Sequence, residues 1–171
     1  MEAIPVKQCA VGMYGGKFMP FHKGHFYCIE KALMQCEKVY VILFYGGADE
    51  EKILAQEKND YLTVENRIKQ IQFAMKEYFS QENVEFKLID VSLCRDKNGE
   101  EDWDAETPLV LNAIGKMDAV YSSEPSYEAY FQRAYPWAKH ILVDPPREVY
   151  PISGTKIRSM KDINEQKKWM V

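Results

Sequence analysis

Two of the chain's three histidines stand three positions apart in the segment GGKFMPFHKGH, which ends at His25. Gly15 and Gly16 open this segment and allow the backbone to turn sharply and to approach a ligand closely. Lys17 adds a mobile positive charge, and His22 and His25 can both turn toward one point and donate hydrogen bonds to phosphate oxygens. Because the segment leads into a predicted helix, whose free N–H groups favour an anion, it is typical of a phosphate-binding loop.

The histidine spacing has two other interpretations. His22 and His25 could form a zinc pair, although no third ligand has a recognisable spacing, or they could face solvent in a loop. The segment is neither a P-loop nor a dinucleotide-binding turn, since it contains neither GxxxxGK[ST] nor GxGxxG.

A second segment, PISGTKIRSM at residues 151–160, also favours an anion site. Ser153 is a candidate helix cap, Gly154 allows close approach, and Thr155 and Arg158 lie three apart on one helical face. Taken alone, this segment is explained equally well as a plain helix cap. Together, the two segments are far more specific than either is alone.

The elements that must position these residues alternate along the chain. The predicted strands are residues 8–14, 38–45, 84–91, 119–122 and 140–143, and the predicted helices are residues 25–35, 64–79, 108–114 and 127–134. This alternation predicts an α/β fold, a Rossmann-like, doubly wound parallel sheet with helices on both faces. Ligands of such sheets bind at the carboxyl ends of the strands.

Two polar stretches are predicted as loops. Residues 94–107 are too long for a simple connection, which favours a functional loop. Trp103 stands in it among acidic residues with no apolar periodicity, so it is not easily explained as a core residue. Residues 46–60 form the second predicted loop, and most of its charges are equally well explained as a solvated, mobile surface.

The composition bounds the class of protein. With 171 residues, 46% of them hydrophobic and 28% charged, the chain is expected to form one globular domain over residues 1–171. No apolar run is long enough to span a membrane, and the N-terminus lacks a signal-peptide pattern, so we expect a soluble, cytoplasmic protein. A net charge of −4 argues against a general nucleic-acid binder. The four cysteines show no CxxC spacing and are expected to be free thiols, mostly buried.

The two segments together resemble the signatures of a known superfamily. The pattern GxFxPxHxGH is matched by Gly16, Phe18, Pro20, His22, Gly24 and His25, and a late SGTxIR is matched by residues 153–158. The chain is thereby similar to the HxGH nucleotidyltransferase superfamily. Within it, the chain most resembles nicotinamide-mononucleotide (NMN) adenylyltransferases of the archaeal and bifunctional NAD-regulator types, through YSSEPSYEAYF (121–131) and VDPPREVYPISGTKIR (143–158). It departs from the bifunctional members in having no P-loop kinase domain, and it ends soon after Trp169, where relatives often continue.

The resemblance implies transfer of the adenylyl group of ATP to NMN, giving NAD and pyrophosphate. It assigns Lys17, His22, His25 and Arg158 to the triphosphate as catalytic groups, since positive and hydrogen-bonding side chains stabilise the charge that develops there. It further implies Mg²⁺ held mainly by phosphates, with few protein ligands. The ATP-binding residues also include Gly15, Gly16, Ser122, Ser153 and Thr155.

The acceptor site is implied at Phe18, Arg67 and Trp103, with Arg67 on the NMN phosphate and Trp103 stacked on the nicotinamide ring. Three alternatives stay open. Arg67 could be a surface residue of its helix, and Trp103 could fold onto the domain surface or lie in a subunit contact. The protein could also be a homo-oligomer rather than a monomer. The expected partners are the small molecules ATP and NMN, without nucleic acid or membrane. Sister transferases acting on phosphopantetheine, FMN or a cytidylyl acceptor, and a non-catalytic nucleotide sensor, are the competing functions.

Overall fold

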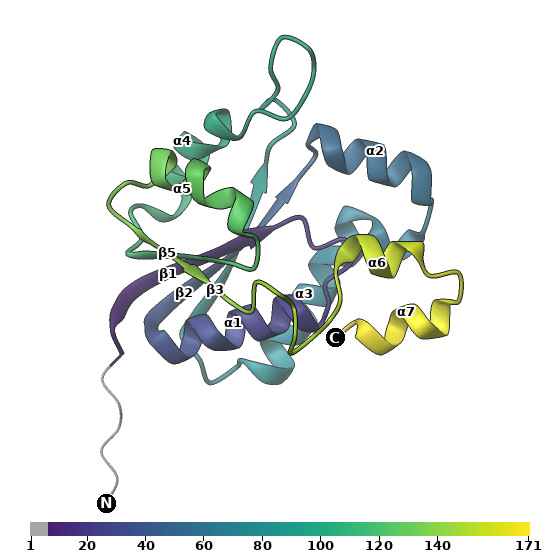
Figure 1. Cartoon of the computed structure of the whole chain (residues 1–171), viewed down its shortest axis with the longest axis horizontal. Helices are drawn as coiled ribbons and strands as arrows, with labels where there is room; N and C mark the ends of the chain where they lie inside the picture. Colours follow the sequence, from purple (N-terminus) through teal and green to yellow (C-terminus); the bar gives the residue numbers. More distant parts are fainter. Residues whose placement is uncertain (1–6) are drawn as a thin grey trace, which may run out of the picture.

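A computed structural model describes residues 7–171, which form a five-stranded, fully parallel sheet with the strand order β3-β2-β1-β4-β5 (Figure 1). The strands are β1 (Cys9–Gly16), β2 (Cys36–Tyr45), β3 (Val84–Asp90), β4 (Ala119–Ser122) and β5 (Lys139–Leu142). The predicted α/β parallel sheet is confirmed. Residues 1–6 lie outside the described residues. They belong to the N-terminal segment that lacks a signal-peptide pattern.

Helices cover both faces of this sheet. The α-helices are α1 (Lys23–Gln35), α2 (Ala48–Glu57), α3 (Val64–Tyr78), α4 (Trp103–Ile114), α5 (Glu128–Ala134), α6 (Gly154–Ser159) and α7 (Ile163–Trp169). Two short 3-10 turns are η1 (Asp60–Leu62) and η2 (Pro125–Tyr127). In residues 7–171, no helix combines the length and the apolar character that crossing a membrane requires.

Alternating strand residues build two hydrophobic clusters, one on each face. Met13 and Val120 pack with side chains of α4 and α5, whereas their neighbours Tyr14 and Tyr121 pack with α1 and α3. Successive side chains of a strand point to opposite faces, so each strand contributes to both clusters. Figure 1 shows the same division, with α4 and α5 on one side of the sheet and α1 and α3 on the other.

Both predicted loops were too long. Within residues 46–60 the structure contains helix α2, whose first turn carries three acidic residues that suit the positive end of a helix dipole. Within residues 94–107 helix α4 already begins at Trp103, because the Asp102 carboxylate caps it by accepting from the backbone N–H groups of Asp104 and Ala105. The expectation that this helix starts at Pro108 was therefore wrong by five residues.

The strand order places a topological switch between β1 and β4. From β1 the chain proceeds to β2 and β3 on one side, and then crosses back to β4 and β5 on the other. Connections that leave two adjacent strands in opposite directions open a crevice beyond the carboxyl ends of those strands. The ends of β1 and β4, at Gly16 and Ser122, therefore mark the expected ligand site.

Candidate functional site

Two adjoining cavities open at this switch point, and we refer to them as the basic cleft and the aromatic pocket. Gly15, Gly16, Lys17, Ser122 and Tyr127 line both and form their shared wall. The other polar residues of the basic cleft include His22, His25, Arg147, Ser153, Thr155 and Arg158. The aromatic pocket is also lined by Glu101, Trp103, Glu106, Tyr130, Phe131 and Tyr135. The structure thus brings all of the predicted ATP-site residues into one cavity.

The two glycines of the shared wall have a different role from the one expected. Gly15 and Gly16 are the last residues of strand β1, not a turn. A Cβ atom at Gly15 would lie 2.5 Å from the Phe44 ring, and one at Gly16 would lie 3.3 Å from the Phe18 ring. The chain turns instead at Phe18, whose φ of 54° lies in the left-handed region. The glycines therefore make room for neighbouring rings.

His22 and His25 cap helix α1 through each other. The Nδ1 atom of His22 accepts from the Gly24 backbone N–H at 3.0 Å, and the Nδ1 atom of His25 accepts from the His22 backbone N–H at 3.1 Å. The two rings stack with centroids 3.6 Å apart. Since each Nδ1 accepts, each neutral ring carries its proton on Nε2 and keeps one donor free of the cap.

Burial keeps both rings uncharged. It lowers the pKa of His22 to about 3, with a further contribution from the Arg147 guanidinium. Burial also lowers the pKa of His25 well below its usual range, and His22 and Arg147 act in the same direction. The histidines are therefore neutral hydrogen-bond donors at pH 7, and the positive charge of the cleft comes from lysine and arginine.

Arg158 joins the two motif segments, which are far apart in the sequence. Its Nη1 donates to the Met19 carbonyl at 2.6 Å, and its Nη2 donates to the Thr155 hydroxyl at 3.3 Å. Ser153 caps α6 by accepting from the Lys156 backbone N–H at 3.1 Å. A Cβ atom at Gly154 would lie 2.9 Å from the Met19 carbonyl oxygen, so the absence of a side chain there lets the two segments pack together.

Sequence reasoning missed Arg147, the third cation of the basic cleft. It lies in the quoted segment 143–158 but belongs to no motif, and only its position after two prolines sets it apart. Its φ is 55°, and its Nη1 donates to the Ile152 carbonyl at 3.0 Å. The Asp144 carboxylate holds the loop by accepting from the N–H groups of Glu148 and Val149. This side chain is thus fixed against the loop that leads to α6.

Sequence reasoning also missed the partner of Ser122. The Ser122 hydroxyl lies 2.9 Å from Nε2 of His140, the third histidine of the chain. Ser122 ends β4 and His140 lies in the adjacent parallel strand β5, so only the strand pairing brings them together. The contact orients a hydroxyl that borders both cavities.

The structure places Arg67 away from the acceptor site that was expected for it. Its side chain is fully buried, pairs with the Glu50 carboxylate, and donates at 2.8 Å to the carbonyls of Leu62 and Lys17. It lines neither cavity. Each of its three nitrogens donates to a protein acceptor, and the bond to the Lys17 carbonyl positions the backbone of Lys17 in the shared wall.

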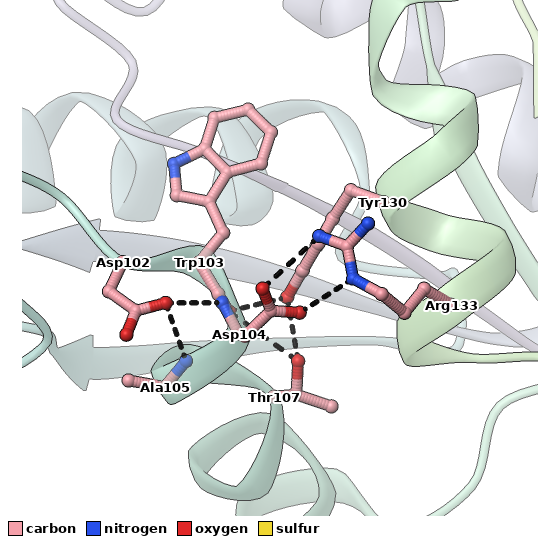
Figure 2. A network of polar contacts seen from close by, with 7 residues as sticks. All are labelled: Asp102, Trp103, Asp104, Ala105, Thr107, Tyr130 and Arg133. Atoms are coloured by element: carbon pink, nitrogen blue, oxygen red, sulfur yellow. Dashed lines mark hydrogen bonds and ion pairs between the residues drawn. The ribbon is translucent and has the colours of Figure 1, made fainter. Parts of the chain in front are cut away.

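Trp103 lines the aromatic pocket, and a polar network fixes its backbone (Figure 2). The Tyr130 hydroxyl donates to the Trp103 carbonyl at 2.8 Å, and the Arg133 guanidinium makes a two-point ion pair with Asp104 at 2.9 and 3.2 Å. These contacts connect the start of α4 to α5. In Figure 2 the indole projects away from the network. It packs edge-on against Tyr127 and Tyr130, with centroid distances of 4.8 and 5.3 Å.

The remaining acceptor candidate, Phe18, lines the other cavity. It is buried in the wall of the basic cleft, with its ring edge-on to His25 at 4.8 Å. The structure therefore does not bring Phe18, Arg67 and Trp103 together into one site. Phe18 instead packs against His25, one of the two histidines that keep an Nε2 donor free of the cap.

Two carboxyl groups in the aromatic pocket had no sequence signal. Glu101 pairs with Lys17 at 3.4 Å and accepts from the Trp103 indole N–H at 3.1 Å. Glu106 stands one turn along α4 from Trp103, and burial is the largest of the effects that raise its pKa to about 7. They lie in a stretch with three other acidic residues, Glu100, Asp102 and Asp104, and nothing in the pattern separates a pocket carboxylate from a solvated one.

The described residues contain no cluster of three or more histidine, cysteine or carboxylate side chains that could hold a metal ion. The four cysteines are free, and Cys28, Cys36 and Cys94 are buried, as expected.

A parallel sheet of this strand order, with the histidine and SGTxIR segments facing one cavity at its switch point, defines a Rossmann-like nucleotidyltransferase fold. The sequence profile of the cytidylyltransferase-like family matches residues 13–160. The chain belongs to this family.

Individual relatives are distant and longer. The chain is 26% identical over 167 residues to the trifunctional NAD biosynthesis/regulator protein NadR of Salmonella typhimurium, covering 91% of this chain and 38% of that protein. A crystal structure of NadR in complex with NAD and AMP-PNP superposes with a TM-score of 0.65 at 20% identity, covering 96% of this chain and 45% of that one. A bifunctional NMN adenylyltransferase/ADP-ribose pyrophosphatase of Francisella tularensis, complexed with AMP and a manganese ion, gives 0.57 at 17% identity, covering 95% and 44%. The chain thus spans less than half the length of these relatives.

Proposed function

We propose that this domain transfers the adenylyl group of ATP to NMN, giving NAD and pyrophosphate. The observation that carries the proposal is the pair of unlike cavities that share one wall at the switch point. A cleft with three cationic side chains and two neutral histidine donors suits a triphosphate. A pocket of aromatic rings suits the flat ring of the acceptor. The distant similarity to NadR supports the same choice of substrates.

The chemistry needs no nucleophile from the protein. A phosphate oxygen of NMN attacks the α-phosphorus of ATP, and a new P–O bond forms. The bond from that phosphorus to the oxygen bridging to the β-phosphate breaks, and pyrophosphate leaves with the electron pair. The attacking group is already an anion, so catalysis consists of in-line positioning and of stabilising charge on the α-phosphate and on the leaving group.

Each residue of the basic cleft has a role in this proposal. Lys17, Arg147 and Arg158 neutralise phosphate charge, and the Nε2–H groups of His22 and His25 donate to phosphate oxygens. Ser153, Thr155 and Ser122 add hydrogen bonds at its edges, and the backbone of Gly15 and Gly16 forms part of its wall. Mg²⁺, when bound with ATP, would supply charge neutralisation at the phosphates, and the described residues of the cleft would contribute few ligands to it.

The aromatic pocket would take the nicotinamide ring on Trp103, since an indole face attracts a cationic pyridinium ring. Arg67 is not part of this proposal because its side chain is fully buried and lines neither cavity.

The test is a reaction series with product identification by mass. The protein is incubated with ATP, Mg²⁺ and each acceptor in turn: NMN, nicotinic-acid mononucleotide, phosphopantetheine and FMN, with CTP replacing ATP in a parallel series. We expect NAD and pyrophosphate to be the main products. A main product with another acceptor or with CTP would assign the chain to a sister transferase, and binding without any product would assign it to the nucleotide sensors.

A further inference from the structure

Glu106 is a buried acid without a partner. Its side chain lies in the wall of the aromatic pocket and is 9% exposed. Within residues 7–171 it makes no hydrogen bond and no ion pair. In the neighbouring Glu101, Oε2 contacts Lys17 and the Trp103 indole N–H, while Oε1 is buried without a partner. Buried carboxyl groups are normally paired, because taking an ionised carboxylate out of water without a partner is costly. An unpaired one beside a cavity indicates a ligand group that completes it.

The surroundings of Glu106 define which ligand group fits. Trp103, Tyr127 and Tyr130 line the pocket, with Trp103 packed edge-on against both tyrosines, and aromatic faces attract cations. Lys17 is the cation that borders the pocket, and Glu101 already pairs with it. The pocket as a whole is therefore suited to a flat ring that is positively charged and that donates hydrogen bonds.

We propose that Glu106 is the specificity-determining residue of the acceptor pocket, selecting a mononucleotide whose cationic ring carries a neutral amide over one whose ring carries a carboxylate. This inference rests on the proposed function. The pyridinium of NMN is a cation with an amide that donates N–H bonds, so it can satisfy the Glu106 carboxylate. The ring of nicotinic-acid mononucleotide adds a second carboxylate, which the acidic wall repels.

The selection must depend on pH, because burial and then Glu101 raise the pKa of Glu106 to about 7. Above that pH the ionised carboxylate accepts from the amide of NMN and repels the carboxylate of nicotinic-acid mononucleotide. Below it the protonated group loses both effects, so discrimination falls. The titratable or charged groups around Glu106 are Lys17, Asp49, Cys94, Glu101, Asp102, Tyr130 and Tyr135.

The experiment compares wild type with Glu106→Gln, which keeps the shape of the side chain and removes its charge. We measure kcat/KM for NMN and for nicotinic-acid mononucleotide between pH 6 and pH 8.5, and their binding by quenching of tryptophan fluorescence. Glu77→Gln, at an exposed position of α3, is the matched control. We expect the wild-type preference for NMN to rise through pH 7, and Glu106→Gln to lower it about 10-fold at pH 8 and to remove its pH dependence.

The outcomes separate this inference from the proposed function. If NMN is a substrate but the preference is the same in Glu106→Gln as in wild type, the role of Glu106 is overturned and the function stands. If neither mononucleotide binds or reacts, the proposed function has failed, and the inference with it. If Glu106→Gln does not fold, the wild-type protein still decides, since a preference independent of pH between 6 and 8.5 rejects the role of Glu106.

Discussion

The basic cleft and the aromatic pocket share a wall but are built in different ways. The cleft joins segments from the two ends of the domain, held by contacts to main-chain atoms such as the Arg158 bond to the Met19 carbonyl. The pocket is formed by residues of β1, β2 and β4 together with side chains of α4, α5 and the segments next to these helices. Phosphate groups require particular donors at particular places, whereas a flat ring requires only a suitable shape and charge. This difference explains why the cleft is marked by two short motifs, whereas the pocket is marked only by Trp103 and by the looser resemblance of residues 121–131.

The largest expected effect concerns the wall that both cavities share. Arg67→Met leaves the Glu50 carboxylate and the Lys17 carbonyl buried without their partner, and losing one member of a buried ion pair costs about 3–5 kcal/mol. Urea unfolding measures this loss. Adding Glu50→Gln to the same chain is expected to recover part of it, because the unpaired charge is then gone.

Arg67→Met also tests the distinction between the cavities. Since Arg67 supports the backbone of Lys17, which borders both cavities, the affinities for ATP and NMN are expected to fall in parallel. If the variant lost NMN affinity alone and was as stable as wild type, Arg67 would instead be a residue of the acceptor site.

The next effect is confined to the basic cleft. His25→Ala is expected to lower kcat roughly 100-fold, the scale of one preorganised donor, with a smaller change in the KM for ATP. His25 also caps α1 through Nδ1, so His25→Asn is the matched variant: an amide oxygen can accept from the His22 N–H, but no atom replaces Nε2–H. Steady-state kinetics should give the same low kcat for both variants. A normal kcat in His25→Asn would contradict the assignment.

The sequence predicted the framework better than its details, and the reasons are physical. Five apolar runs predicted all five strands. The central strands leave a nearly continuous hydrophobic signal because they are buried, and the edge strands β3 and β5 keep enough apolar and β-branched residues to be recognised. Helix α2 was missed because its charges hide the few residues that it buries. The start of α4 was missed because Pro108 was interpreted as the first helical residue, although Asp102 had already supplied a cap.

The site residues that belong to a sequence motif were predicted, and most of those that do not were missed. His22, His25, Ser153 and Arg158 lie together as expected, because each belongs to a motif. Arg147, His140 and Glu106 carry no motif, and their places depend on loop geometry, strand pairing and helix packing that no local pattern encodes. The buried position of Arg67 depends on α2, the helix that the sequence did not indicate.

A smaller effect is expected in the aromatic pocket. Trp103→Ala should weaken NMN binding by several-fold to about 30-fold, since a ring–cation contact contributes about 0.5–2 kcal/mol, and should leave ATP affinity nearly unchanged. Calorimetric titration of both ligands measures this. Trp137→Ala, at a partly exposed tryptophan that lines neither cavity, is the control. An equal loss for ATP and NMN would reject Trp103 as the platform for the acceptor ring.

The smallest expected effect concerns the free energy of unfolding on mild acidification. His22 in the basic cleft and Glu106 in the aromatic pocket should change it in opposite directions. The pKa of His22 is lowered to about 3 in the folded protein, so its stabilising contribution is complete above the unfolded value of 6.5 and is lost as the pH falls toward 3. Glu106, whose pKa is raised to about 7, behaves oppositely: acidification from pH 7 to 5.5 protonates it mainly in the folded state and adds stability. Each contribution is about 1 kcal/mol over this interval.

Urea unfolding at pH 7 and pH 5.5 separates these two contributions. His22→Asn removes the loss of stability that His22 causes as the pH falls, so this variant should lose less stability on acidification than wild type. Glu106→Gln removes the gain of stability that protonation of Glu106 gives, so this variant should lose more stability than wild type. The difference between a variant and wild type cancels the ionisable groups that the two have in common, which is why the sign can be read even though each effect is small. Shifts of the same sign in both variants would mean that the basic cleft and the aromatic pocket do not differ in the protonation states assigned to them.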